Sequence, residues 1–298
     1  MNRNMSNRRL VGGIALSLLA LGLFSTQALA QVGGPITGSK HDLTALTGPV
    51  AGAYKFTSTV NTTEMCVFCH TPHGAATNDI PLWNRSYAGG VYQAYSALNS
   101  VTTQSAFLAV GSSSLACLSC HDGGQAMNVM INTPGSGTAG TYAGTWTTGP
   151  VTGQQIGASL AFIGLDLRND HPISIQYGGG PLLATSIPTT DGTSYTAFED
   201  PEFKSVSSSG TGTAQRWWVN TPIWNATGGT AARERTDMQL YGRTGAYISG
   251  ASTVLASINQ PYVECGTCHD PHNSRANPGN FLRTGNGGSA ICLACHDK

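Results

Sequence analysis

The sequence predicts a loop-rich fold with few short helices and minor strands. The chain has 298 residues, of which 38 are glycines and only 40% are hydrophobic. Charged residues make up 10% and the formal net charge is zero, so nothing in the charge pattern indicates a nucleic-acid partner. All eight cysteines fall within four copies of one motif, Cys-x-x-Cys-His. The fold must therefore be organised around what these motifs hold.

Cys-x-x-Cys-His is the attachment signature of a c-type haem. The two thiols bond to the haem vinyl groups and the adjoining histidine ligates the iron. Disulfides, zinc sites and a redox dithiol are the alternatives for such cysteines. No cysteine is left over, and every second one precedes a histidine, so we predict four covalently attached haem c groups. The predicted haem-binding residues are Cys66, Cys69, His70, Cys117, Cys120, His121, Cys265, Cys268, His269, Cys292, Cys295 and His296.

Four porphyrins supply large apolar surfaces that can replace much of a side-chain core. The predicted class is thus a loop-rich multihaem cytochrome c fold whose core is formed largely by four stacked haems. Without haem we expect the chain to be largely unfolded, as metal-nucleated domains are.

Residues 1–30 have the pattern of a secretory signal peptide, with three arginines, an apolar run and the cleavage site Ala28-Leu29-Ala30. A membrane anchor is the alternative, but the apolar run of about 15 residues is short against the roughly 20 that span a bilayer. We expect no transmembrane segment in the mature chain. The protein is predicted to be secreted, extracellular or at the cell surface, with the periplasm as the alternative, since bacterial c-type haem is attached outside the cytoplasm.

The mature chain reads as two copies of a two-haem unit, residues 31–135 and 136–298. Each copy has a lone histidine, a motif with a Pro-His tail, and a motif followed by aspartate. An insert at about 178–260 enlarges the second copy and contains Trp217 and Trp218. Short strands are expected in the insert, a helix between 91 and 110, and loop over the Gly/Thr/Ser-rich residues 132–160.

Four histidines remain after the motifs are counted, and four irons need four sixth ligands. We therefore predict that every iron has two histidine ligands. The predicted metal ligands are His70, His121, His269 and His296 from the motifs, with His41, His73, His171 and His272 as the sixth ligands. A methionine ligand, which would raise the reduction potential, is the alternative, and the candidates are Met65, Met127, Met130 and Met238.

Chain length limits which histidine serves which iron. His73 is three residues from His70 and cannot reach the opposite face of the same porphyrin, so we expect it to serve the haem of His121. By the same argument His272 serves the haem of His296. His41 and His171 then remain for the haems of His70 and His269.

Cationic and aromatic residues near the motifs have two interpretations. The cations either pair with haem propionates or are solvated surface charges, and they are Lys40, Arg85, Arg168, Arg275 and Arg283. Trp83 and Tyr262 are expected to pack against porphyrin.

The runs His41–Thr44, Cys69–His73, Pro81–Arg85, Asp170–Ser174 and Phe281–Arg283 resemble those of the doubled-CxxCH multihaem cytochromes of metal-reducing bacteria. Among these, four haems, a signal peptide and this length resemble the OmcE-type extracellular tetrahaem cytochromes. The resemblance implies polymerisation into filaments, with a continuous chain of haems. It also implies that an axial histidine can come from the next subunit. His41 is then the candidate for the histidine that binds a haem of the next subunit, which competes with its assignment to the haem of His70.

These inferences predict an extracellular electron carrier, polymerised into a conductive filament or nanowire. Iron with two histidine ligands has no open position, so an enzyme is not expected. The alternatives are a monomeric periplasmic electron shuttle and a tetrahaem reductase with one open haem. Expected partners are other copies of the chain and redox proteins or extracellular acceptors, and no nucleic acid.

Overall fold

The structure is a computed structural model. It describes residues 36–37, 39–44, 56–57, 62, 64–76, 80–86, 90–93, 110–134, 140–141, 145–146, 151–152, 155–157, 160–170, 172–179, 200, 202–210, 215–221, 233, 236–243, 260–272 and 281–297. The predicted signal peptide, His171, Arg275 and most of the helix expected at 91–110 lie outside the described residues. Within the described part, no helix is both long and apolar enough to cross a membrane.

The helices are short, and each of the four motifs lies on or at the end of one. They are η1 (Met65–Phe68), α2 (Ser112–His121), α3 (Cys265–Cys268) and α4 (Ala290–Leu293). One helical turn brings residues i, i+3 and i+4 to the same face. That is the spacing of the two cysteines and the histidine, so a single turn presents all three to one side. The described residues also form three short 3-10 helices besides η1: η3 (Leu167–Asn169), η4 (Tyr177–Gly179) and η7 (Gly287–Ser289).

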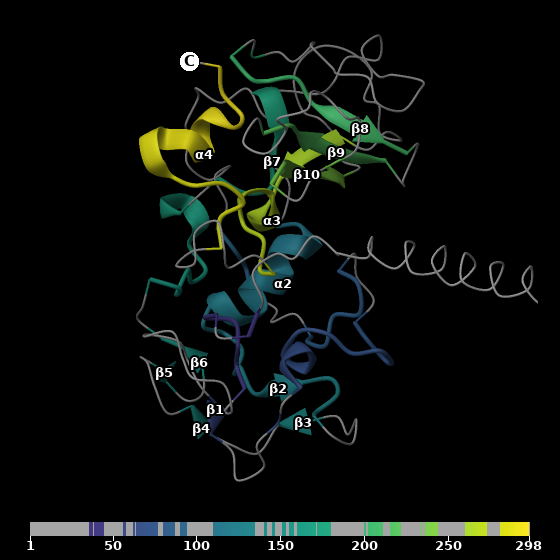
Figure 1. The fold of residues 1–298 in the computed structure, drawn as a ribbon. Helices are drawn as coiled ribbons and strands as arrows, with labels where there is room; N and C mark the ends of the chain where they lie inside the picture. The colour runs from purple at the N-terminus through teal and green to yellow at the C-terminus, as the bar shows by residue number, and fades with distance from the viewer. Residues whose placement is uncertain are drawn as a thin grey trace, which may run out of the picture. The chain divides into compact units, whose positions relative to one another are not determined.

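A five-stranded antiparallel sheet lies in the second half of the chain (Figure 1). Its order is β7 (Ile175–Gln176), β11 (Gln260–Val263), β10 (Met238–Arg243), β9 (Arg216–Val219) and β8 (Ser207–Ser209). Strands β8, β9 and β10 belong to the insert, so the strands expected there pair into one sheet with β7 and β11 from outside it. In the register, Leu240 lies opposite Trp217.

Among the described residues earlier in the chain there are three two-stranded sheets. They pair β1 (Phe56–Thr57) with β4 (Thr145–Trp146), β2 (Val129–Met130) with β3 (Gly140–Thr141), and β5 (Val151–Thr152) with β6 (Gln155–Ile156). The prediction of loop over 132–160 is therefore wrong at β3 to β6. Threonine, valine, isoleucine and tryptophan supply the β propensity at these positions, between the glycines.

Each of three clusters of buried side chains packs against at least one of the motifs. The cluster under the five-stranded sheet contains Tyr177, Val206, Trp217, Val219, Met238, Leu240 and Ala294 of the fourth motif. A second cluster contains Phe68 of the first motif with Met127, Met130 and Ile156, and Cys69 and Cys120 pack against it. A third joins Leu118 of the second motif to Leu167 and Ile173, with Cys265 packed against it. Residues between the motif cysteines are thus core residues, which anchors each turn by burial.

The first and third motifs are followed by the same backbone arrangement. His70 bridges to Trp83 and His269 bridges to Leu282, at the same separation along the chain. The residue before each bridge partner has a left-handed backbone: Leu82 at φ 58° and Phe281 at φ 55°. Left-handed backbone costs roughly 1–2 kcal/mol in a residue other than glycine. Its recurrence at equivalent positions shows that both copies make the same sharp return toward the motif.

Candidate haem-attachment sites

Hydrogen bonds orient the motif histidines. Nδ1 of His70 lies 2.9 Å from the carbonyl oxygen of Pro81, and Nδ1 of His121 lies 2.6 Å from that of Ala161. A histidine that binds metal through Nε2 commonly donates its Nδ1 proton to such a carbonyl. Burial lowers the pKa of His121, which favours the neutral imidazole that a metal ligand requires. The contacts at Nδ1 therefore leave Nε2 of His70 and of His121 available to bind iron.

Three motifs are closed by the same backbone ladder. Each motif histidine bridges to a partner residue: His70 to Trp83, His269 to Leu282 and His296 to Phe203. The residue after each partner donates its N–H to the carbonyl of the second motif cysteine: Asn84 to Cys69, Arg283 to Cys268 and Lys204 to Cys295, each at 2.8 Å. The ladder fixes the turn on which the sulfurs and the histidine sit.

The side chain of that same residue also bonds to its motif. In each case it donates to the carbonyl of the first residue between the cysteines. The bonds run from Asn84 Nδ2 to Val67 at 2.6 Å, from Arg283 Nε to Gly266 at 2.9 Å and from Lys204 Nζ to Leu293 at 2.5 Å. We call these side chains the motif braces. This role is not evident from the sequence, in which the one signal is a hydrogen-bond donor at the equivalent position each time.

Arg85 plays the corresponding part at the second motif, where its Nη2 donates to the carbonyl of Ser119 at 3.2 Å. It also donates to the carbonyls of Met127 and Ala126, both at 2.8 Å. Arg85 is 1% exposed and Arg283 is 7% exposed, so the interpretation of these two as solvated surface charges is wrong. Arg168 does lie at the surface, where it pairs with Asp166 at 2.6 Å.

Two buried donors near the first two motifs have no hydrogen-bond partner in the described part of the chain. They are Nε of Arg85 and Nε1 of Trp83. Within the described part of the chain, the buried guanidinium of Arg85 has neutral acceptors only, and a buried charge without a counter-ion is costly. Haem propionates are carboxylates and would supply both the acceptor and the negative charge. The donors therefore fit a haem at this place.

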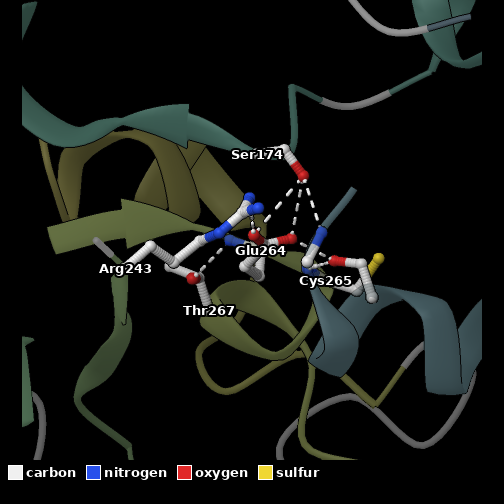
Figure 2. A network of polar contacts seen from close by, with 7 residues as sticks. Ser174, Arg243, Glu264, Cys265 and Thr267 are labelled. Atoms are coloured by element: carbon white, nitrogen blue, oxygen red, sulfur yellow. Dashed lines mark hydrogen bonds and ion pairs between the residues drawn. The ribbon is translucent and has the colours of Figure 1, made fainter. Parts of the chain in front are cut away.

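Glu264 joins the second and third motifs (Figure 2). Its buried carboxylate accepts hydrogen bonds from Ser114 Oγ at 2.5 Å, Ser174 Oγ at 3.2 Å and Arg243 Nη1 at 3.1 Å. Ser114 lies on α2, and its Oγ also accepts the backbone N–H of Cys265 on α3, at 3.0 Å. Burial raises the pKa of Glu264, and its three donors oppose that shift. The network ties the segments that carry the second and third motifs.

The cysteines are free thiols, of which Cys66 and Cys292 are exposed and the other six are partly buried. All eight are described, and none forms a disulfide. Burial raises the pKa of Cys69 and Cys295 to about 12 and that of Cys268 to about 11. A redox dithiol needs a thiol with a lowered pKa, because the thiolate is the attacking species. Cys69 and Cys295 therefore lack the activated thiol of a redox dithiol, whereas in the third motif a hydrogen bond with Cys117 lowers the pKa of Cys265.

Two of the predicted sixth ligands lie beside motif histidines. The ring centroids of His272 and His70 are 6.0 Å apart with 21° between their planes. Those of His41 and His121 are 6.3 Å apart with 69° between their planes. These neighbours differ from the pairing predicted from chain length, which assigned His41 to the haem of His70 and His272 to the haem of His296. The packing of the two halves brings the tail of the third motif to the first, and local spacing along the chain does not contain this contact.

His73 is exposed, and its backbone carbonyl accepts a hydrogen bond from Asn132 Nδ2 at 2.7 Å. The predicted contact of His73 with His121 is taken instead by His41. The methionine candidates have packing roles: Met127, Met130 and Met238 are buried in the side-chain clusters. Met65 accepts a hydrogen bond from Thr37 Oγ1 at 3.7 Å.

Comparison with known families supports the haem interpretation for the C-terminal part of the chain. Residues 260–298 match the doubled CXXCH motif. This stretch contains the third and fourth motifs, and the match is consistent with a multihaem c-type cytochrome. CXXCH motifs indicate covalently bound haem c. No curated protein matches the chain.

Proposed function

We propose that this protein is an electron carrier with four haem c groups, one on each motif, and two histidine ligands on each iron. The observation that carries the proposal is the pair of histidine couples, His70 with His272 and His121 with His41, at 6.0 and 6.3 Å. When bound, haem supplies reversible one-electron chemistry at iron. With histidine at both axial positions, no position is open for a substrate.

The chain's own residues hold the ligands in place. The motif cysteines anchor the porphyrin edge, the carbonyls of Pro81 and Ala161 orient His70 and His121, and the braces fix the turns. Rigid ligands suit electron transfer, because a change of charge at the iron then requires little movement of the surrounding protein.

The first three attachment segments contact one another in the order in which they follow along the chain. Cys69 and Cys120 pack against one cluster, which brings the first and second motifs together. Helices α2 and α3 are joined through Ser114 and Glu264, which brings the second and third motifs together. Contact between successive segments supports an electron path from haem to haem.

We further propose that the carrier is secreted and assembles with copies of itself into an extracellular filament. The N-terminal sequence pattern and the resemblance to OmcE-type cytochromes support this proposal. His41 lies against its own chain, where it stacks on Phe281 at 4.1 Å. His73, which is exposed, is therefore better placed than His41 to serve a neighbouring subunit.

Purified holoprotein tests the proposal. Intact mass should show four haems, the optical spectrum should be low-spin, and carbon monoxide should not bind the reduced protein. A high-spin band with carbon monoxide binding would instead favour the reductase. Negative-stain microscopy of the secreted fraction separates a filament from a monomeric shuttle.

A further inference from the structure

We propose that His272 is the sixth ligand of the iron attached at Cys66–His70, and that His41 is the sixth ligand of the iron attached at Cys117–His121. This assignment rests on the proposed function, because it needs haems on the first two motifs. It makes the second half of the chain supply a ligand to a haem of the first half.

The ring separations fit this assignment. A metal–imidazole bond is about 2.0 Å long. A five-membered ring with bonds near 1.35 Å has a centre-to-corner distance of about 1.15 Å. Two imidazoles on opposite sides of one iron therefore have centroids about 6.3 Å apart. The observed 6.0 Å for His272 and His70 and 6.3 Å for His41 and His121 match this value.

An oxygen atom lies near Nδ1 in all four rings. It is at hydrogen-bond distance for His70 and His121, at the outer limit of that distance for His41, and beyond it for His272. For His70 and His121 it is the carbonyl of Pro81 or Ala161, at 2.9 and 2.6 Å. For His41 it is the carbonyl of Pro271 at 3.5 Å, and for His272 the carboxylate of Asp270 at 3.7 Å. An oxygen at Nδ1 is the arrangement that directs metal to Nε2.

The second half also positions His41. Its ring stacks on Phe281 at 4.1 Å with 9° between the planes, and its Nδ1 lies near Pro271. Phe281 belongs to the sharp return that closes the third motif, so the residues that close that motif also hold a ligand for the second haem. Both assignments therefore depend on the same packing of the halves. His73 and His171 remain for the irons of His269 and His296.

The ring angles give the two irons different spectroscopic signatures. Low-spin ferric haem with nearly parallel imidazoles gives a rhombic EPR signal, whereas nearly perpendicular imidazoles give a highly anisotropic signal with a large maximum g value. The 21° pair predicts the first for the iron of His70, and the 69° pair predicts the second for the iron of His121.

The test uses secreted holoprotein with His272→Ala, and with His73→Ala as the matched control from the equivalent Pro-His tail. Intact mass first establishes that both carry the wild-type number of haems. A lower number in the wild type itself would overturn the proposed function, separately from the ligand assignment. We expect His272→Ala to convert the haem of His70 to high spin and to abolish its rhombic signal. His73→Ala removes a ligand from a different iron, so it should retain the rhombic signal of the His70 haem. Added imidazole should restore the low-spin state.

Hydrogen exchange then locates the affected haem. His272→Ala should speed amide exchange at Cys66–Thr71 and leave Cys292–His296 as in the wild type, and His41→Ala should act at Leu115–His121. Faster exchange at Cys292–His296, or loss of the rhombic signal in His73→Ala alone, would overturn the assignment. If His272→Ala fails to mature, His272→Met keeps a ligand. The His272→Met variant should then have one haem with a histidine and a methionine ligand in place of the haem that gives the rhombic EPR signal. An EPR spectrum identical to that of the wild type would overturn the assignment.

Discussion

Asn84 offers the sharpest test of the motif braces. Its side chain is fully buried and makes three hydrogen bonds. Nδ2 donates to the carbonyls of Val67 at 2.6 Å and Asn132 at 2.7 Å, and Oδ1 accepts the N–H of Asn132 at 2.8 Å. Asn84→Leu keeps the size of the side chain and removes all three bonds.

The expected loss follows from that count. Each lost hydrogen bond costs about 1 kcal/mol net, and each buried polar group left without a partner costs about 1–3 kcal/mol. Asn84→Leu should therefore destabilise the folded protein by about 3 kcal/mol. For a chain of this size that corresponds to roughly 6–12 °C in the melting temperature.

Thermal melting of the holoprotein, followed by haem circular dichroism at one scan rate, measures the loss. The matched control is Asn286→Leu, because Asn286 is exposed and its side chain does not cap η7. We expect the control to stay within about 0.5 kcal/mol of the wild type. If Asn84→Leu melts together with the control, the brace contributes nothing and the reasoning from buried hydrogen bonds is wrong.

Three further predictions concern other contacts. Glu264→Ala should lower the unfolding free energy by about 4 kcal/mol in denaturant titration, because Ser114, Ser174 and Arg243 lose a charged acceptor. Glu264→Gln keeps an acceptor and should lower the unfolding free energy by less than half as much. Equal losses for the two variants would contradict this prediction. Leu82→Gly should change the melting midpoint by under about 1 kcal/mol, since its side chain is exposed and relief of the left-handed backbone offsets the entropy of glycine. Phe281→Gly should lower the unfolding free energy by about 3 kcal/mol in the same assay, because a buried aromatic ring is lost. Equal losses for Leu82→Gly and Phe281→Gly would refute this prediction. Met238→Leu should leave the haem spectrum unchanged and cost less than about 1.5 kcal/mol, whereas a shift in the haem bands would identify Met238 as an iron ligand.

The attachment chemistry could be predicted because it is local. Each haem motif spans five consecutive residues, and one helical turn suffices to place both sulfurs and the histidine on one side. Counting the remaining histidines then predicts two histidines per iron. The repeat of motif order likewise pointed to equivalent segments, and the left-handed residues Leu82 and Phe281 lie at equivalent positions in them.

Tertiary structure decided which histidine lies beside which. His272 and His70 come from opposite halves of the chain, and no local spacing relates them. Their 6.0 Å separation depends on how the third motif's tail packs near the first motif. The motif braces depend on the fold in the same way. Asn84, Arg283 and Lys204 lie far along the chain from the motif carbonyls to which they donate, and only the folded backbone brings donor and acceptor together.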